Sequence, residues 1–125
     1  MNEHLSDWYA VRLELARTPA FPQGSAARGY ILHLPVGRAG VIDGEAIRKT
    51  SSRAIVRRFW PNEPELVGQL IPTGGDWAFS YRDGPDDDEM LARLANHPIS
   101  AGNYLTITEA DGDVCPYRIA EMKLI

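Results

Sequence analysis

Alternation of apolar and polar residues is the clearest pattern in this chain. The run YAVRLEL, residues 9–15, places its aliphatic and aromatic side chains on one face and its charged side chains on the other. A period of two is typical of a β-strand with one buried face. A helix from Ser6 is the competing interpretation, because Leu5, Trp8 and Tyr9 also have helical spacing. The unbroken alternation favours the strand.

Similar runs recur along the chain, separated by turn residues. The segment 18–29 holds two prolines and two glycines and is expected to be a loop. Gly68 within one run indicates a bulge or a close approach of another backbone, and Pro116, which lacks an N–H, is expected at a strand start or a sheet edge. Turn sequences at residues 73–76 and 110–113 predict two hairpins. Further strands are predicted at residues 30–36, 41–42, 53–60, 66–71, 77–81, 104–109 and 116–125.

One helix is predicted near residues 87–97. Asp86 can cap its N-terminus, and Glu89 three residues later completes a capping box. His97 falls in the last turn, where the helix dipole favours a cation, and Pro98 follows it. The apolar side chains of this segment are spaced as on one helical face, at Met90, Leu91, Leu94 and Ala95.

About seven short strands and one helix within 125 residues predict a mainly β fold in a single domain, residues 1–125. The expected architecture is a small β-barrel, closed or partly open, with the helix covering one opening, or a sandwich. Trp77, Phe79 and Tyr81 share one face of their strand and are expected in the core. Hydrophobic residues make up 44% of the chain, which excludes a disordered protein.

Composition narrows the class of protein. A single cysteine, Cys115, excludes a disulfide framework and any multi-cysteine metal site. No apolar run approaches the length of a membrane helix, and the first residues include Glu3 and Asp7 where a signal peptide carries positive charge. We therefore expect no membrane association and a cytoplasmic location. Arginine outnumbers lysine eleven to two, a bias that together with frequent alanine indicates a GC-rich bacterial genome.

The sequence predicts no cofactor, no metal and no catalytic residue. It contains no Walker loop, no GxGxxG and no GxSxG motif. The acidic run 83–89 lacks the alternating ligand spacing of a calcium loop, and helix capping explains several of its members. His4, His33 and His97 are far apart in the sequence, and Cys115 has no neighbouring cation to lower the pKa of its thiol.

A basic stretch with aromatic residues is the most suggestive candidate site. Five basic side chains between residues 48 and 58 precede Phe59 and Trp60, a combination that binds phosphates and stacks bases in single-strand nucleic-acid grooves. Arg57 and Arg58 point to opposite faces of a strand, so one of them is expected on the apolar face, paired with an acidic group. The candidate binding residues are Arg53, Arg57, Arg58, Trp60 and His97.

The patterns support three hypotheses for function. The leading one is a non-enzymatic binding module of unknown partner, with another protein or a second copy of the chain as candidates. One alternative is a nucleic-acid-binding barrel that uses residues 48–60, and the other is a small enzyme with a His/carboxylate pocket at the barrel mouth. The net charge of −4 hides +5 over residues 48–58 and −6 over residues 82–113. Whether these two stretches pair with each other decides how much basic surface is free.

Overall fold

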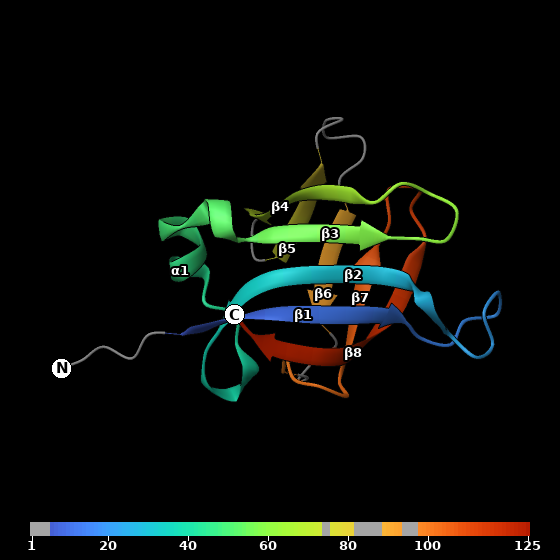
Figure 1. Ribbon diagram of the computed structural model, residues 1–125, viewed down its shortest axis with the longest axis horizontal. Helices are drawn as coiled ribbons and strands as arrows, with labels where there is room; N and C mark the ends of the chain where they lie inside the picture. Colours follow the sequence, from blue (N-terminus) through green and yellow to red (C-terminus); the bar gives the residue numbers. More distant parts are fainter. Residues whose placement is uncertain (1–5, 74–75, 82–88, 94–97) are drawn as a thin grey trace.

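Eight antiparallel strands form one sheet that closes into a barrel (Figure 1). The computed structural model describes residues 6–73, 76–81, 89–93 and 98–125. The strands are β1 (Asp7–Leu15), β2 (Ser25–Val36), β3 (Ile55–Phe59), β4 (Leu66–Thr73), β5 (Asp76–Tyr81), β6 (Glu89–Arg93), β7 (Tyr104–Thr108) and β8 (Val114–Leu124). Each pairs with the next along the chain, and β8 pairs with β1. The predicted mainly β barrel is confirmed in its closed form. Its eight strands in the described chain include β6, where no strand was predicted, whereas the strand predicted at residues 41–42 is only an isolated bridge between Val36 and Ile42.

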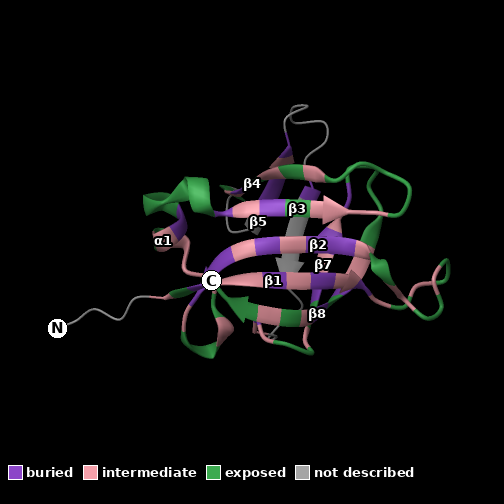
Figure 2. Ribbon diagram, in the orientation of Figure 1, coloured by how far each residue is buried: buried purple, intermediate pink, exposed green. Residues whose placement is uncertain are grey.

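The alternation in the sequence separates the barrel interior from its surface. In β1, the side chains of Val11, Leu13 and Leu15 are buried, with intermediate residues between them (Figure 2). This segment is therefore a strand rather than the competing helix. The loop that follows is shorter than predicted, because β2 begins at Ser25, inside the segment 18–29.

The helix predicted near residues 87–97 is wrong in the part that the structure describes. Glu89–Arg93 form β6, which pairs with β5 on one side and β7 on the other. A helix at this position would leave both neighbouring strands with unpaired N–H and C=O groups, so strand pairing outweighs the local helical spacing. The rest of the predicted segment, including His97 and the capping residue Asp86, lies outside the described residues.

The α-helix of the described chain is α1 (Gly44–Lys49), between β2 and β3. Asp43 caps it: its carboxylate accepts hydrogen bonds from the Ala46 backbone N–H at 3.1 Å and the Ser6 hydroxyl at 2.9 Å. Ile47 packs into the core, so this helix covers one opening of the barrel, where β2 ends and β3 begins (Figure 1). Two 3-10 turns flank it, η1 (Arg38–Gly40) and η2 (Ser51–Arg53). Among the described residues, no helix has the length and apolar character needed to cross a membrane.

Gly68 allows two strands to approach each other closely. It lies opposite Tyr81 in the β4–β5 register. A Cβ atom at this position would overlap the Ser80 carbonyl oxygen and come within 2.8 Å of the Tyr81 ring. Of the two explanations predicted for this glycine, close approach is therefore confirmed, and it makes room for an inward-facing tyrosine.

Pro116 lies near the start of β8 but not at a sheet edge. It pairs with Thr106 of β7, and its carbonyl accepts a hydrogen bond from the Ala16 N–H at 3.0 Å. Because β8 is paired on both sides, the closed barrel offers no free edge at this strand for a second chain.

Candidate functional site

Arg57 and Arg58 occupy opposite faces of β3, as alternation predicts. Arg57 points outward and forms a surface ion pair with Glu65 at 3.0 Å. Arg58 points inward, and its Nε lies 3.9 Å from Oε2 of Glu89. The arginine on the apolar face therefore meets an acidic residue, and this pair joins one residue of the basic stretch to one residue of the acidic stretch inside the barrel.

The other candidate residues of the basic stretch, Arg53 and Trp60, take part in cation–π contacts just beyond the two ends of β3. The guanidinium of Arg53 lies 4.4 Å from the centre of the Trp8 ring. Trp60 contacts Arg58 instead, at the other end of β3. The basic residues of α1 are exposed and lie beyond the start of β3. Arg53 and Arg57 both lie near His33, whereas Arg58 turns away from them into the barrel.

His33 is the histidine that the structure describes. Partial burial and the neighbouring cations Arg57 and Arg53 lower its pKa. Its charged neighbours are thus guanidinium groups, and it does not form the His/carboxylate pair that the enzyme hypothesis requires within the described residues. His4 and His97 lie outside them.

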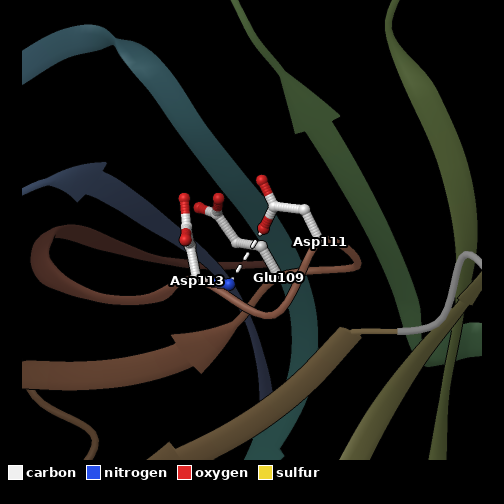
Figure 3. A group of neighbouring side chains, drawn as sticks. All are labelled: Glu109, Asp111 and Asp113. Atoms are coloured by element: carbon white, nitrogen blue, oxygen red, sulfur yellow. Dashed lines mark hydrogen bonds between the residues drawn. The ribbon is translucent and has the colours of Figure 1, made fainter.

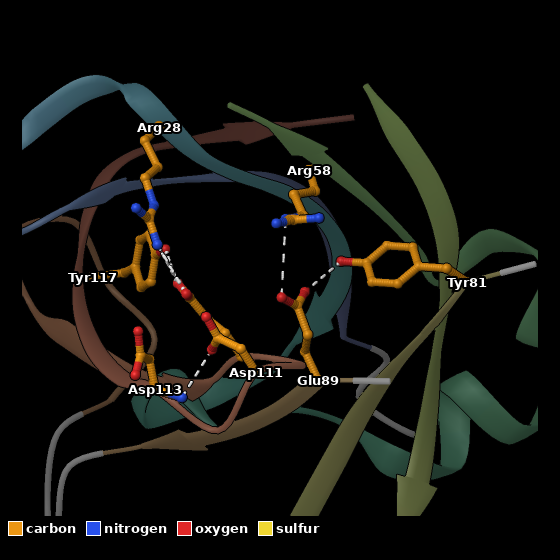
Figure 4. Close-up of polar contacts among 8 residues, drawn as sticks. Arg28, Arg58, Tyr81, Glu89, Asp111, Asp113 and Tyr117 are labelled. Atoms are coloured by element: carbon orange, nitrogen blue, oxygen red, sulfur yellow. Dashed lines mark hydrogen bonds and ion pairs between the residues drawn. The ribbon is translucent and has the colours of Figure 1, made fainter. Parts of the chain in front are cut away.

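Polar side chains gather inside the barrel at the end opposite α1. Neighbouring strands run in opposite directions, so the ends of β3, β5 and β7 and the starts of β2, β6 and β8 meet there. Figure 4 shows several of these side chains, among them Arg28, Arg58 and Glu89. We call this group the polar mouth, and it consists of Arg28, Tyr30, Arg58, Trp60, Tyr81, Glu89, Glu109 and Tyr117.

Glu89 is a buried carboxyl group in the polar mouth. Its side chain is 2% exposed, and Oε1 accepts a hydrogen bond from the Tyr81 hydroxyl at 2.8 Å. Burial raises the pKa of Glu89, while the hydrogen bond from Tyr81 and the charge of Arg58 oppose the rise. Glu89 therefore keeps its proton to higher pH than an exposed glutamate.

Glu109 is the second buried carboxyl group. Nη2 of Arg28 donates to its two oxygens at 2.8 and 3.0 Å, and the Tyr117 hydroxyl donates to Oε2 at 2.6 Å. Arg28 belongs to a bulge of β2, because residues 26–28 lie between the β1–β2 pairs Glu14↔Gly29 and Leu15↔Ser25. The bulge lets Arg28 reach into the mouth, where both carboxylate oxygens of Glu109 accept hydrogen bonds.

Aromatic rings and guanidinium groups form the outer layer of the mouth. The guanidinium carbons of Arg58 and Arg28 lie 3.4 and 3.9 Å from the centre of the Trp60 ring, and Arg28 also lies 5.6 Å from the Phe21 ring. The two arginine side chains are only 16 and 18% exposed. They are therefore recessed beneath the rim rather than spread on the surface.

Four polar atoms of the mouth are buried without a hydrogen-bond partner among the described residues: Arg28 Nε, Arg58 Nε, Trp60 Nε1 and the Tyr30 hydroxyl. Tyr30 is fully buried against the rings of Phe79 and Tyr117, and burial and the nearby Glu89 raise the pKa of its hydroxyl. Folded proteins leave few buried polar atoms unpaired. These atoms are therefore where a bound molecule would find partners.

A group of carboxylates extends from Glu109 of the polar mouth into the turn between β7 and β8. Glu109, Asp111 and Asp113 each bring an oxygen within 4.8 Å of the others (Figure 3). The turn explains this arrangement, because Oδ1 of Asp111 accepts a hydrogen bond from the Asp113 N–H at 2.9 Å. Arg28 and Tyr117 already engage Glu109. We therefore assign no metal to this group.

Two surface hollows lie elsewhere on the described structure. The larger, of about 600 Å³, lies between the β1–β2 loop and β8, with Arg17, Tyr104 and Arg118 among its lining residues. The second, of about 500 Å³, lies over β3, β4 and β5 and includes Val67 and Ile71. Neither is lined by any of the four residues that carry the unpartnered atoms.

The sequence held a signal for part of the mouth. Alternation places Glu109 on the same face as the apolar Ile107, and Arg28 on the same face as Tyr30. A charged residue continuing an apolar face is a candidate for an inward polar group. Glu89 gave no such signal, because its position suited a helix cap.

No family model, no curated protein and no solved structure matches this chain.

Proposed function

We propose that this protein is a non-enzymatic binding protein that takes a small molecule into the polar mouth of its barrel. The observation that carries the proposal is the set of four buried atoms without hydrogen-bond partners in the mouth. An eight-stranded barrel has an interior just wide enough to be filled by side chains or to hold one small ligand. A molecule with matching polar atoms would complete the missing hydrogen bonds.

The chemistry of the mouth supports binding rather than catalysis. Each carboxyl group already has one tyrosine and one arginine as partners. Burial raises the pKa of Cys115, which lies near Glu109, to about 11, so its thiol stays protonated near neutral pH. The described residues thus offer partners to a ligand but no activated nucleophile.

The position of the arginines supports a small molecule over a nucleic acid. Arg28 and Arg58 are recessed within the barrel, out of line with a continuous phosphate backbone. Arg57, on the outer face, is already paired with Glu65. The nucleic-acid alternative would predict binding of single-stranded oligonucleotides that weakens steeply with salt.

A cytoplasmic location in a bacterium is part of the proposal. The free thiol of Cys115 and the excess of arginine over lysine support it. Fractionation of the source cells would test it, and recovery of the protein outside the cytoplasm would contradict it.

Thermal unfolding in the presence of a chemically mixed library of small metabolites tests the binding function. Some compounds should raise the midpoint of unfolding, because a ligand that binds only the folded state stabilises it. The shift should persist in Arg57→Ala, whose substitution lies on the outer face, and disappear in Arg58→Ala. If no compound shifts the wild type, or if Arg58→Ala responds as the wild type does, the mouth is not a ligand site.

A further inference from the structure

The polar mouth also indicates the chemical class of its ligand. We propose that the ligand is a small organic carboxylate, whose carboxylate group replaces Glu89 as the partner of Arg58. This inference rests on the proposed binding function, to which it adds the ligand's charge and the residue that binds it.

The unpartnered atoms require hydrogen-bond acceptors. Arg28 Nε, Arg58 Nε and Trp60 Nε1 can donate but cannot accept, and only the fourth atom, the Tyr30 hydroxyl, can do both. The Arg58 guanidinium lies 3.4 Å from the centre of the Trp60 ring, so the unpartnered N–H groups of these two residues are close neighbours. A ligand that supplies hydrogen-bond partners to these N–H groups must therefore present acceptor oxygens.

The two arginines of the mouth differ in how firmly they are paired. Arg28 makes two short hydrogen bonds to Glu109, which Tyr117 also engages. Arg58 lies 3.9 Å from Glu89, beyond hydrogen-bond distance. Arg58 is therefore the arginine that can exchange its partner, and the group it already faces is a carboxylate.

Glu89 retains a hydrogen-bond partner when Arg58 binds the ligand instead. It keeps the hydrogen bond from Tyr81 when Arg58 turns to the ligand. The other titratable groups that act on it are Tyr30 and Glu109, which supply no cation. Placing a ligand carboxylate among two buried carboxyl groups favours protonation of Glu89. Binding should therefore take up a proton and weaken as the pH rises.

Titration with benzoate, benzamide and inorganic phosphate tests this inference, monitored through the indole N–H resonance of Trp60. Benzoate should shift the resonance, whereas benzamide of the same shape and phosphate should not. Arg58→Gln should weaken benzoate binding about tenfold or more, since it removes a charge-assisted hydrogen bond. Arg57→Gln, with the same change on the opposite face of β3, should leave it unchanged.

Glu89→Gln supplies a test in the opposite direction. It removes the carboxylate that competes for Arg58, so benzoate binding should tighten and lose its proton uptake, which a merely damaged mouth would not produce. This variant also serves where Arg58→Gln does not fold.

Two results would overturn the inference while leaving the binding function intact. The first is benzamide or phosphate binding at least as tightly as benzoate. The second is weaker benzoate binding in Glu89→Gln. A mouth that binds none of these probes, and no compound of the mixed library, would overturn both proposals.

Discussion

Among single residues, the buried carboxyl of Glu89 links the stability of this protein to pH. Burial raises its pKa above the ordinary value of 4.5, so the folded chain binds this proton more tightly than the unfolded chain. The resulting stability is fully present below the unfolded pKa and is lost as pH rises through the folded pKa. We predict that the free energy of unfolding of the wild type, relative to that of Glu89→Gln, falls as pH rises above 4.5.

Urea unfolding of both proteins between pH 4 and 8 would measure this difference. The comparison with Glu89→Gln cancels the contributions of exposed carboxylates, which both proteins share. A difference that stays constant or increases with pH would show that Glu89 is ionised as readily in the folded chain as in the unfolded one.

Cys115 should react slowly with alkylating reagents. Burial and the nearby Glu109 raise the pKa of its thiol to about 11, so little thiolate forms at pH 8. Because an ordinary free cysteine has a pKa near 8.5, its rate with iodoacetamide should be lower by roughly two orders of magnitude. Mass spectrometry against a free-thiol peptide checks this, and equal rates in the folded protein would contradict it.

Arg58 shows how far residue-scale prediction reaches. Alternation alone requires that Arg57 or Arg58 face the interior and find an acidic partner. Which of the two turns inward depends on the register of β3 with β2, where Arg58 lies opposite Tyr30. That register comes from long-range pairing, so local sequence leaves the choice, and the identity of the partner Glu89, undetermined.

Among the structural elements, α1 packs against the barrel core through one buried residue, Ile47. Ile47 is 1% exposed and joins the core, while the rest of this short helix lies at the surface or in intermediate positions. Ile47→Ala should reduce the free energy of unfolding by about 2–4 kcal/mol, as expected for a buried aliphatic side chain. Arg48→Ala, on the exposed side of the same helix, should change it by less than about 0.5 kcal/mol. Denaturant unfolding of both variants measures the difference; similar losses would mean that α1 does not close the barrel through Ile47.

Strands and helix differed in how well sequence predicted them. The predicted antiparallel pairings of β4 with β5 and of β7 with β8 are confirmed, because turn residues and alternation agree there. Glu89–Arg93 carried helical spacing but form β6, whose two partners lie elsewhere in the chain. In α1, a single buried residue leaves no apolar stripe for sequence analysis to detect.

At the scale of the whole molecule, closure brings the two ends of the described chain together. Tyr9 lies opposite Leu124, and the Ile125 N–H donates to the Trp8 carbonyl at 3.0 Å. We predict that a circular permutant will fold, with a linker of about four residues from Ile125 to Ser6 and new termini at the 110–113 turn. Four residues extend to about 13 Å at most, which suffices only for neighbouring ends.

Circular dichroism and thermal unfolding, with unpermuted residues 6–125 as the control, would test the permutant. Wild-type-like spectra and a cooperative transition are expected. An unfolded permutant alongside a folded control would contradict the pairing of β1 with β8, since ends on opposite edges of an open sheet could not be joined by so short a linker.

Because Arg58 and Glu89 form a buried ion pair, selection for thermal stability and selection for ligand binding should favour different residues at these two positions. Replacing a buried ion pair by apolar residues of similar volume is often neutral or stabilising, whereas removing one partner is costly. Under selection for heat resistance alone, Arg58 and Glu89 should therefore be replaced together by aliphatic residues, while Ile47 at the opposite end persists. Such variants would remain folded to a higher temperature than the wild type and would no longer bind its ligand.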